Sequence, residues 1–436
     1  MNLLRALTPV LVVALAAGCS GGPGDQGDQG NLGTVPPAGR PSLAPSATAS
    51  PTSPPASLPV PTVPAVGGEP ARFSPPALRV EVITRGLEHG WDIGFLPDGS
   101  ALISERPGRF TLVRQLRPGA RATRVSADFS DLFARGEGGL MGLVVHPDFA
   151  SSRLFTTCQN HGRGGRAIDI RLVTWRLAGD GGSATRVRDL LTGLPTAGSG
   201  RHSGCRPSIA ADGALLVGTG DTADGALPQD RTSLGGKVLR LNLTTGEPLP
   251  DNPFAAAAQP AERYVYTYGH RNVQGVAVRP GSGQVYTAEH GPRVNDEVNV
   301  LRAGGNYGWD PSRGGTAGGY DEDVPMTDLD RFPDAVPAIW QTGQTTQALC
   351  AATFLTGSLW GELDGALVVT ALRGAKLVLL RLDAAGALAA IAIPPETNGE
   401  YGRLRAARLG PDGALYVTTT NGSDDALLRI TPEAAP

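Results

Sequence analysis

The chain has 436 residues, enough for one large domain or two ordinary ones, and a formal net charge of −3. That charge gives no reason to expect nucleic acid or an acidic membrane surface as the main partner. Aromatic residues make up only 5% of the chain, which holds 60 Gly and 37 Pro; this mixture disfavours a helical bundle and favours many turns.

The N-terminus predicts a signal peptide, residues 1–18, that takes no part in the fold. Arg5 supplies a positive charge, the apolar run 7–17 is too short to span a bilayer, and "LAAGC" ends at Cys19. This pattern resembles a bacterial lipoprotein signal with Cys19 as the lipidated first residue. The alternative is an ordinary secretory signal with an incidental Cys19. Both predict an extracytoplasmic protein, and the first attaches it to the membrane through a lipid anchor only.

Residues 19–70 are rich in Gly, Pro, Ser, Thr and Ala. Such a stretch cannot bury enough apolar surface to offset the entropy of ordering it. We therefore expect a disordered, partly extended tether that holds the folded domain, residues 71–436, away from a membrane.

Three cysteines, Cys158, Cys205 and Cys350, remain after Cys19. Outside the cytoplasm they allow one disulfide and one leftover thiol, and we favour the pair Cys158–Cys205. The alternative is three buried free thiols. The spacing excludes a zinc site built from paired cysteines.

Six segments repeat one pattern: an apolar alternating run, a turn rich in Pro, Asp or Gly, and a second strand-like run, which together indicate a β-hairpin. They begin at Gly90, Gly139, Cys205, Gly275, Cys350 and Arg403. Six units over about 360 residues give roughly 60 residues each, the size of a four-stranded blade with long loops. Radial repetition also protects sheet edges. The sequence therefore predicts an all-β fold, a six-bladed β-propeller with four-stranded blades.

The loops at one mouth of a propeller converge, so polar residues just before the first strand or after the second strand of each unit can meet. Those positions hold Glu137, His202, Asp221, His270, Arg271, Asn272, Glu289, His290, Asp296, Glu297, Arg373, Arg403 and Arg405. We interpret them as a mouth with one exposed histidine, a carboxylate and several arginines. Clustered arginines suit a small molecule with several carboxylates, with His202 beside it as a base. Turn carbonyls and acids in "EHGPRVNDE" are hard ligands suited to Ca²⁺.

Five stretches occur in an order that resembles a known family: "GEGGLMGLVVHPDF", "GKVLRLNLTTGEPLPDNPF", "YGHRNVQGVAV", "EHGPRVNDEVNVLRAGGNYGWD" and "RLRAARLGPDGALYV". Over residues 78–432 the chain resembles the soluble pyrroloquinoline quinone (PQQ)-dependent glucose/sorbosone dehydrogenases, which include the aldose sugar dehydrogenases. The resemblance implies a six-bladed propeller with PQQ and Ca²⁺ at the mouth. It also implies oxidation of the anomeric carbon of an aldose sugar to a lactone, with electrons passed to an external acceptor.

The resemblance implies that His202 is the general base, that Asp221 supports it, and that Arg271 and Asn272 contact the quinone and stabilise charge as it is reduced. The alternatives are a surface-loop histidine, an aspartate that caps a turn, and a structural Arg-Asn loop. His270 is expected to be structural.

Four further residues match cofactor-binding positions: Glu137, Arg373, Arg403 and Arg405. The last two are expected to clamp PQQ carboxylates. Glu137 stands where some members have Gln. Arg373 stands where Lys is frequent, so a planar, forked guanidinium replaces the point charge of an ammonium group.

The carbonyls of Gly291 and Pro292 resemble donors to the Ca²⁺ that polarises the quinone. Glu297 and the backbone of Tyr307 resemble a second, structural Ca²⁺ site of some members. A tight turn is the alternative for the first pair.

Two other functions stay open at this stage. A non-catalytic cell-surface binding or sensor propeller would keep the shape of the cofactor site. A lactonase-type propeller would need Glu, Asn and Asp around one metal, and the arginine-rich mouth argues against it. A nicotinamide enzyme is disfavoured, because no glycine fingerprint follows a strand and opens a helix.

Overall fold

A computed structural model describes residues 70–317 and 319–433 of the chain. The predicted signal peptide, Cys19 and the tether as far as residue 69 lie outside the described residues. Within the described residues, no helix is both long enough and apolar enough to cross a membrane.

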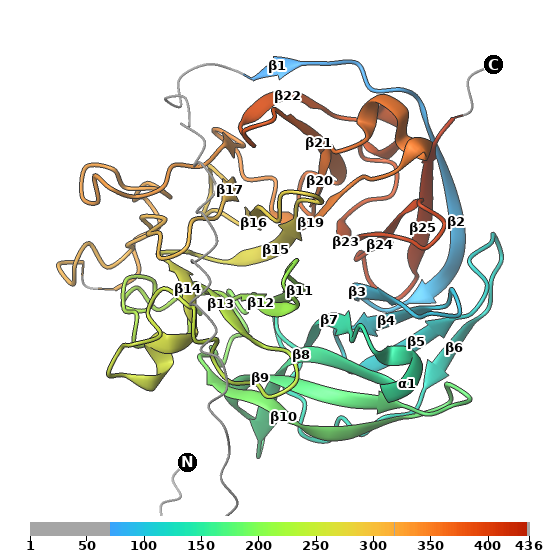
Figure 1. Cartoon of the computed structure of the whole chain (residues 1–436), viewed down its shortest axis with the longest axis horizontal. Coiled ribbons are helices and arrows are strands. Elements are labelled where there is room, and N and C mark those ends of the chain that lie inside the picture. The colour runs from blue at the N-terminus through green and yellow to red at the C-terminus, as the bar shows by residue number, and fades with distance from the viewer. Residues whose placement is uncertain (1–69, 318, 434–436) are drawn as a thin grey trace, which may run out of the picture. The chain divides into compact units, whose positions relative to one another are not determined.

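The described residues form six sheets arranged around a common axis (Figure 1). The strands nearest the axis are β3 (Gly90–Phe95), β7 (Leu140–Val145), β11 (Arg206–Ile209), β15 (Val273–Val278), β19 (Leu349–Phe354) and β23 (Leu404–Leu409). Each of these inner strands contacts the next, and β23 contacts β3, so the ring is closed. The prediction of an all-β, six-bladed propeller is therefore confirmed.

Each inner strand begins a sheet that runs outward through antiparallel neighbours. The outer strands of the first three blades are β4 (Ala101–Glu105), β5 (Arg109–Val113), β6 (Ala122–Val125), β8 (Leu154–Arg163), β9 (Arg166–Leu177), β10 (Ala184–Leu194), β12 (Ala214–Gly218), β13 (Lys237–Asn242) and β14 (Val265–Tyr268). Those of the other three are β16 (Val285–Glu289), β17 (Glu297–Val300), β18 (Trp340–Gln341), β20 (Leu367–Ala371), β21 (Lys376–Leu382), β22 (Leu388–Ala392), β24 (Leu415–Thr419) and β25 (Asp425–Pro432).

The sixth blade contains strands from both ends of the domain. Its order is β2-β25-β24-β23, and β2 (Leu78–Leu87) pairs antiparallel with β25 from Leu78↔Pro432 onward. The sequence analysis did not assign this closing strand. A two-residue strand, β1 (Ala71–Arg72), adds to the fifth blade by parallel pairing with β22. Because β2 completes the last sheet, the ring closes through hydrogen bonds between strands far apart in the sequence.

Helical segments serve only as short connectors in the described part of the chain. They are α1 (Phe149–Ser152) and the 3₁₀ turns η1 (Pro260–Tyr264), η2 (Ser358–Leu363) and η3 (Pro395–Thr397).

The core lies between neighbouring sheets, so each sheet is buried on both faces. Every residue of β12 and of β20 is buried, which explains their continuous apolar sequences. At two glycines, neighbouring inner strands approach too closely for a side chain. A Cβ added at Gly275 would lie 2.3 Å from the Cys350 carbonyl oxygen, and one added at Gly142 would lie 2.3 Å from Pro207. Glycine at these positions permits the ring to close.

A buried aspartate ties four inner strands together. Asp92 on β3 accepts a hydrogen bond from the Leu143 amide on β7 at 3.1 Å. Its carboxylate also pairs with Arg206 on β11 at 2.8 Å and with Arg408 on β23 at 2.9 Å. Burial alone would raise the pKa of Asp92, but Arg206 and Arg408 outweigh burial and lower it.

Arg206 also contacts the inner strands of the remaining two blades. Its Nε donates to the Gln274 carbonyl on β15 at 2.8 Å, and its Nη2 lies 3.8 Å from Cys350 Sγ on β19. Its guanidinium also stacks 4.0 Å above the Trp91 ring. The axial charge cluster of Asp92, Arg206 and Arg408 therefore contacts all six inner strands.

We predict that Asp92→Asn lowers the free energy of unfolding by about 3–5 kcal/mol, because it leaves two guanidiniums without their buried counter-charge. Urea denaturation would measure the loss. Asp412→Asn is the matched control: Asp412 pairs with Arg429 near the surface, so we expect a change below about 1 kcal/mol. Equal losses in the two variants would contradict this interpretation.

The axial charge cluster also predicts acid sensitivity. Because the folded state lowers the pKa of Asp92, its stabilising effect is present above the usual aspartate range and is lost as the pH falls toward the folded pKa. Between pH 5 and pH 2, wild type should therefore lose more stability than Asp92→Asn. Thermal melting across this range would test the difference, and parallel pH profiles would contradict it.

Candidate active site

The predicted mouth residues flank the strands as expected. Glu137 lies just before β7, His202 before β11, and Arg271 and Asn272 before β15, while Asp221 follows β12. Hydrogen bonds from Asn272 to Glu137 and from the Gly204 amide to Asn272 show that the segments before β7, β11 and β15 converge. An isolated bridge between Gly220 and Asn272 joins two of these segments directly.

His202 and Asp221 form a buried pair. The distance from His202 Nδ1 to Asp221 Oδ1 is 2.8 Å. The chain is fixed here by a close approach: a Cβ added at Gly220 would lie 1.8 Å from the His202 carbonyl oxygen. The expectation of an exposed histidine is wrong, because His202 is only 3% exposed. Tyr320 covers it, with the two rings 5.8 Å apart.

Asn272 links Glu137 to the His202 loop. Its Nδ2 donates to Glu137 Oε2 at 3.0 Å, and its Oδ1 accepts from the Gly204 amide at 3.1 Å and from Gln274 Nε2 at 3.2 Å. The structure therefore brings Glu137 and Asn272 together, on the side of the mouth next to His202.

Arg271 is buried and reaches toward a neighbouring acid. Its Nη1 donates to the His290 carbonyl at 2.8 Å and its Nη2 donates to Glu322 Oε1 at 2.9 Å. Arg201 donates to the same Glu322 oxygen at 2.8 Å. The Arg271 Nε is buried and has no hydrogen-bond partner among the described residues.

Several positive charges surround His290. Burial, then Arg271, His202, Arg405 and Arg403, lower the pKa of His290 to about 3, so this imidazole stays neutral. Arg405 is buried; its Nη1 donates to Gln274 Oε1 at 3.3 Å, and its Nε has no partner in the described chain.

Arg106, which the sequence analysis did not select, belongs to the same group. Burial and then Arg405 lower its pKa. Arg106 directly follows β4, the second strand of its blade, so the rule used for the other mouth residues could have found it. The concentration of guanidiniums suits a ligand with several carboxylates.

Two predicted cofactor arginines are placed differently. Arg403 precedes β23 at the rim and is exposed. Arg373 lies in the turn after β20, where it is exposed and forms no hydrogen bond or ion pair with the described residues. Burial and then Arg405 lower the pKa of Arg403, so these two guanidiniums lie near each other.

The first predicted metal position is a fixed turn. Asp296 accepts from the Gly291 amide at 2.8 Å and from Thr346 Oγ1 at 2.6 Å, so its carboxylate holds the turn in place. The carbonyl oxygens of Gly291 and Pro292 accept no hydrogen bond from any described residue. They are free to act as hard oxygen ligands.

The second predicted metal position surrounds Glu297, which is buried. Its Oε1 accepts from Gln341 at 2.9 Å and from Thr327 at 3.1 Å. Burial and the nearby Glu289 raise the pKa of Glu297 to about 8. Tyr307 is buried and stacks on His270 at 4.5 Å. Within the described residues, no three His, Cys, Asp or Glu side chains are grouped as a metal site.

A disulfide joins Cys158 on β8 to Cys205, which directly precedes β11, with their Cα atoms 6.1 Å apart. It connects the second blade to the third, three residues after His202. Cys350 is a buried free thiol.

Comparison with known proteins places this arrangement in a family. The glucose / sorbosone dehydrogenase family model matches residues 87–429. The chain belongs to the glucose / sorbosone dehydrogenase family. The match includes every mouth residue named above.

Two related sequences and one solved structure are similar to most of the chain. An uncharacterized protein of Synechocystis sp. is 33% identical over 81% of this chain and 87% of its own length. The aldose sugar dehydrogenase YliI of Escherichia coli is 29% identical over 82% of this chain and 94% of its own. The PQQ-bound structure of an aldose sugar dehydrogenase from Streptomyces coelicolor is 30% identical over 82% of this chain and 99% of its own, with a TM-score of 0.66.

Within this family framework, sequence reasoning missed three residues between β17 and β18. Trp309 Nε1 and the Tyr320 hydroxyl both donate to Asp221, and Glu322 accepts from Arg271. The segment has no periodic pattern and no repeat counterpart, so the sequence offered no signal for them.

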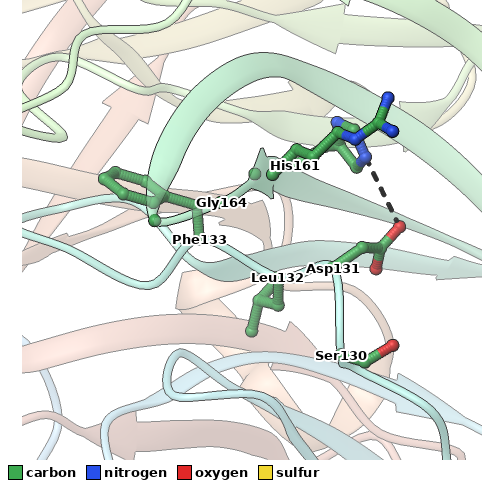
Figure 2. A pocket seen from close by; sticks show the side chains of 9 residues that line it. Ser130, Asp131, Leu132, Phe133, His161 and Gly164 are labelled. Atoms are coloured by element: carbon green, nitrogen blue, oxygen red, sulfur yellow. Dashed lines mark ion pairs between the residues drawn. The ribbon is translucent and has the colours of Figure 1, made fainter.

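A separate cavity lies beside the β8–β9 hairpin. Figure 2 shows His161 and Asp131 facing each other there, with His161 Nε2 3.8 Å from Asp131 Oδ2. It is lined by Ser130, Asp131, Leu132, Phe133 and the turn 161–165. None of the predicted site residues lines it.

Lys237 fixes the segment that carries Asp221. Its Nζ is buried and donates to the carbonyls of Leu227, Pro228 and Gly235 at 2.7, 3.1 and 2.6 Å. Burial lowers the pKa of Lys237 to about 7. With three carbonyl partners, the Lys237 Nζ holds the returning loop against the blade.

We predict that Lys237→Met changes how stability depends on pH. Between pH 7 and 10.5 the unfolded chain holds this proton more tightly than the folded chain, so wild-type stability rises with pH on this account. The variant should lose that contribution, which thermal melting from pH 7 to 9.5 would measure. Lys376→Met removes the other lysine, at the start of β21, and should keep the wild-type slope; an unchanged slope in Lys237→Met would contradict the prediction.

Proposed function

We propose that the protein is a PQQ- and Ca²⁺-dependent aldose sugar dehydrogenase that oxidises the anomeric carbon of an aldose to a lactone and passes the electrons to an external acceptor. The observation that carries the proposal is the buried His202–Asp221 pair beside a cluster of guanidiniums. The names of the Escherichia coli relative and of the PQQ-bound Streptomyces structure support it.

The residues present fit PQQ, a quinone that carries three carboxylates. Arg271 and Arg405 each keep a buried Nε without a partner in the described chain, so a further acceptor would satisfy both. Arg403, Arg405 and Asn272 would hold the cofactor, with Glu137 oriented by Asn272. When bound, PQQ supplies the acceptor for the hydride that leaves the sugar C1.

His202 supplies the base. With Nδ1–H donated to Asp221, its Nε2 carries the lone pair that accepts the proton of the sugar C1 hydroxyl. Asp221 then stabilises the imidazolium that forms. Arg271 and Asn272 would donate hydrogen bonds where negative charge develops, in a site shielded from bulk water.

A calcium ion is supported by the two free carbonyl oxygens of Gly291 and Pro292, which lie one and two residues after His290. There the ion would act as a Lewis acid. Glu297 and the Tyr307 backbone are proposed for a structural calcium ion. The lipid anchor at Cys19 and the extracytoplasmic location also remain proposals.

The proposal predicts turnover that needs PQQ. The purified protein with Ca²⁺ and PQQ should oxidise glucose or another aldose in the presence of an artificial electron acceptor. His202→Ala should lower kcat at least about 100-fold, because it removes the base. His161→Ala, at the separate cavity, should keep wild-type turnover. Absence of PQQ binding would contradict the proposal, and tight binding without turnover on any aldose would favour a sensor.

The arginine cluster predicts unequal contributions to PQQ affinity. Arg405→Ala should weaken PQQ binding about 10- to 100-fold, because a buried guanidinium pairs strongly with a carboxylate. Arg373→Ala should change binding less than about threefold, because Arg373 is exposed and solvent screens its pairing with a carboxylate. Calorimetric titration with PQQ would measure both, with melting temperatures as the control for folding. The reverse order would place the cofactor against Arg373.

A further inference from the structure

Asp221 receives two hydrogen bonds that the proposed reaction does not use. The Tyr320 hydroxyl donates to Oδ2 at 2.6 Å and Trp309 Nε1 donates to the same oxygen at 2.9 Å. The other oxygen, Oδ1, faces His202 and accepts from the Ala223 amide at 2.8 Å. Each oxygen of the Asp221 carboxylate therefore has two hydrogen-bonding partners.

Tyr320 is well held for this role. Its ring lies 6.0 Å from the Trp309 ring in an edge contact, and the Arg201 guanidinium lies 5.9 Å above it. Burial and then Asp221 raise the pKa of Tyr320, so the phenol stays protonated and remains a donor. The hydroxyl oxygen also lies 3.3 Å from His202 Nδ1.

We propose that Tyr320 is a positioning residue for His202, acting through its hydrogen bond to Asp221. For its catalytic meaning, this inference rests on the proposed dehydrogenase function. The bond fixes which carboxylate oxygen faces the imidazole, and it draws negative charge away from that oxygen.

The physical effect follows from the charge on the carboxylate. A donated hydrogen bond stabilises the carboxylate and makes it a weaker base. Without Tyr320, Asp221 would attract the imidazolium form of His202 more strongly, and less neutral His202 would be ready to accept the sugar proton. Tyr320 therefore protects the reactive, neutral form of the base.

Other titratable groups also lie around His202. They are Asp221 after β12, Arg271 before β15, the neutral His290 after β16, and Glu322 from the segment between Trp309 and β18. A change of Tyr320 to Phe removes one hydroxyl and leaves the charges of the other groups unchanged. Any shift in the titration of His202 then reports the lost hydrogen bond.

The test is an NMR titration of the His202 imidazole in the full chain without cofactor, its resonances assigned by their loss in His202→Ala. The chain has only six histidines, which favours resolved signals. In Tyr320→Phe the titration midpoint should rise by about 0.5–1 pH unit, the effect of one hydrogen bond to a carboxylate. Trp309→Phe should shift it in the same direction.

Tyr286→Phe is the matched control. Its buried hydroxyl donates to the Gly386 carbonyl at 3.0 Å, away from the site, and its loss should leave the midpoint unchanged. With PQQ and an aldose, the pH profile of kcat/KM should change in the same way. In Tyr320→Phe, the apparent pKa of its acid side should rise by the same amount, while kcat at high pH is retained.

An unchanged or lowered midpoint in a folded Tyr320→Phe protein would overturn the inference, as would a loss of activity at every pH without a shift. If that variant does not fold, Trp309→Phe decides by the same midpoint. A raised midpoint in a protein without dehydrogenase activity would support the positioning role and contradict the proposed function.

Discussion

The structure depends on the axial charge cluster, because it alone among the contacts described here reaches all six inner strands. Apolar packing between sheets is strong but not directional, so it permits neighbouring blades to shift along each other. Asp92 accepts from an amide and two guanidiniums, and Arg206 donates to a carbonyl on the neighbouring blade. These bonds have defined directions, so they fix the position of each inner strand along the axis relative to its neighbours.

The same cluster is connected directly to the mouth residues. Arg206 is the first residue of β11 and follows the Cys205 disulfide and the His202 loop directly. On its other side, Arg206 contacts Cys350, which also contacts Arg405 at 3.6 Å. The positions of the His202 loop and of Arg405 therefore both depend on one buried ion pair.

The sequence predicted what local chemistry and repetition determine. Hairpin turns identify six blades. Polar residues at the strand ends were expected to converge, and the structure brings Glu137 to Asn272 and His202 to Asp221. It missed what depends on long-range packing: β2 closes the ring from the far end of the domain, and Tyr320 reaches Asp221 from a segment without periodicity. A matching motif also fixes residue identity but not burial, so the sequence did not show that Arg405 is buried while Arg373 is exposed.

Positive charges are concentrated at the mouth of the propeller. Arg106, Arg271 and Arg405 are at least partly buried, while Glu137 and Glu322 supply the facing negative charges, and His290 stays neutral. Positive charge in excess costs stability in the folded protein, much as strain does at other active sites. A ligand with several carboxylates would remove that cost on binding, so affinity and stability would rise together. On the proposed function, the guanidiniums that lower stability at the mouth are thus also the ones that would bind the cofactor.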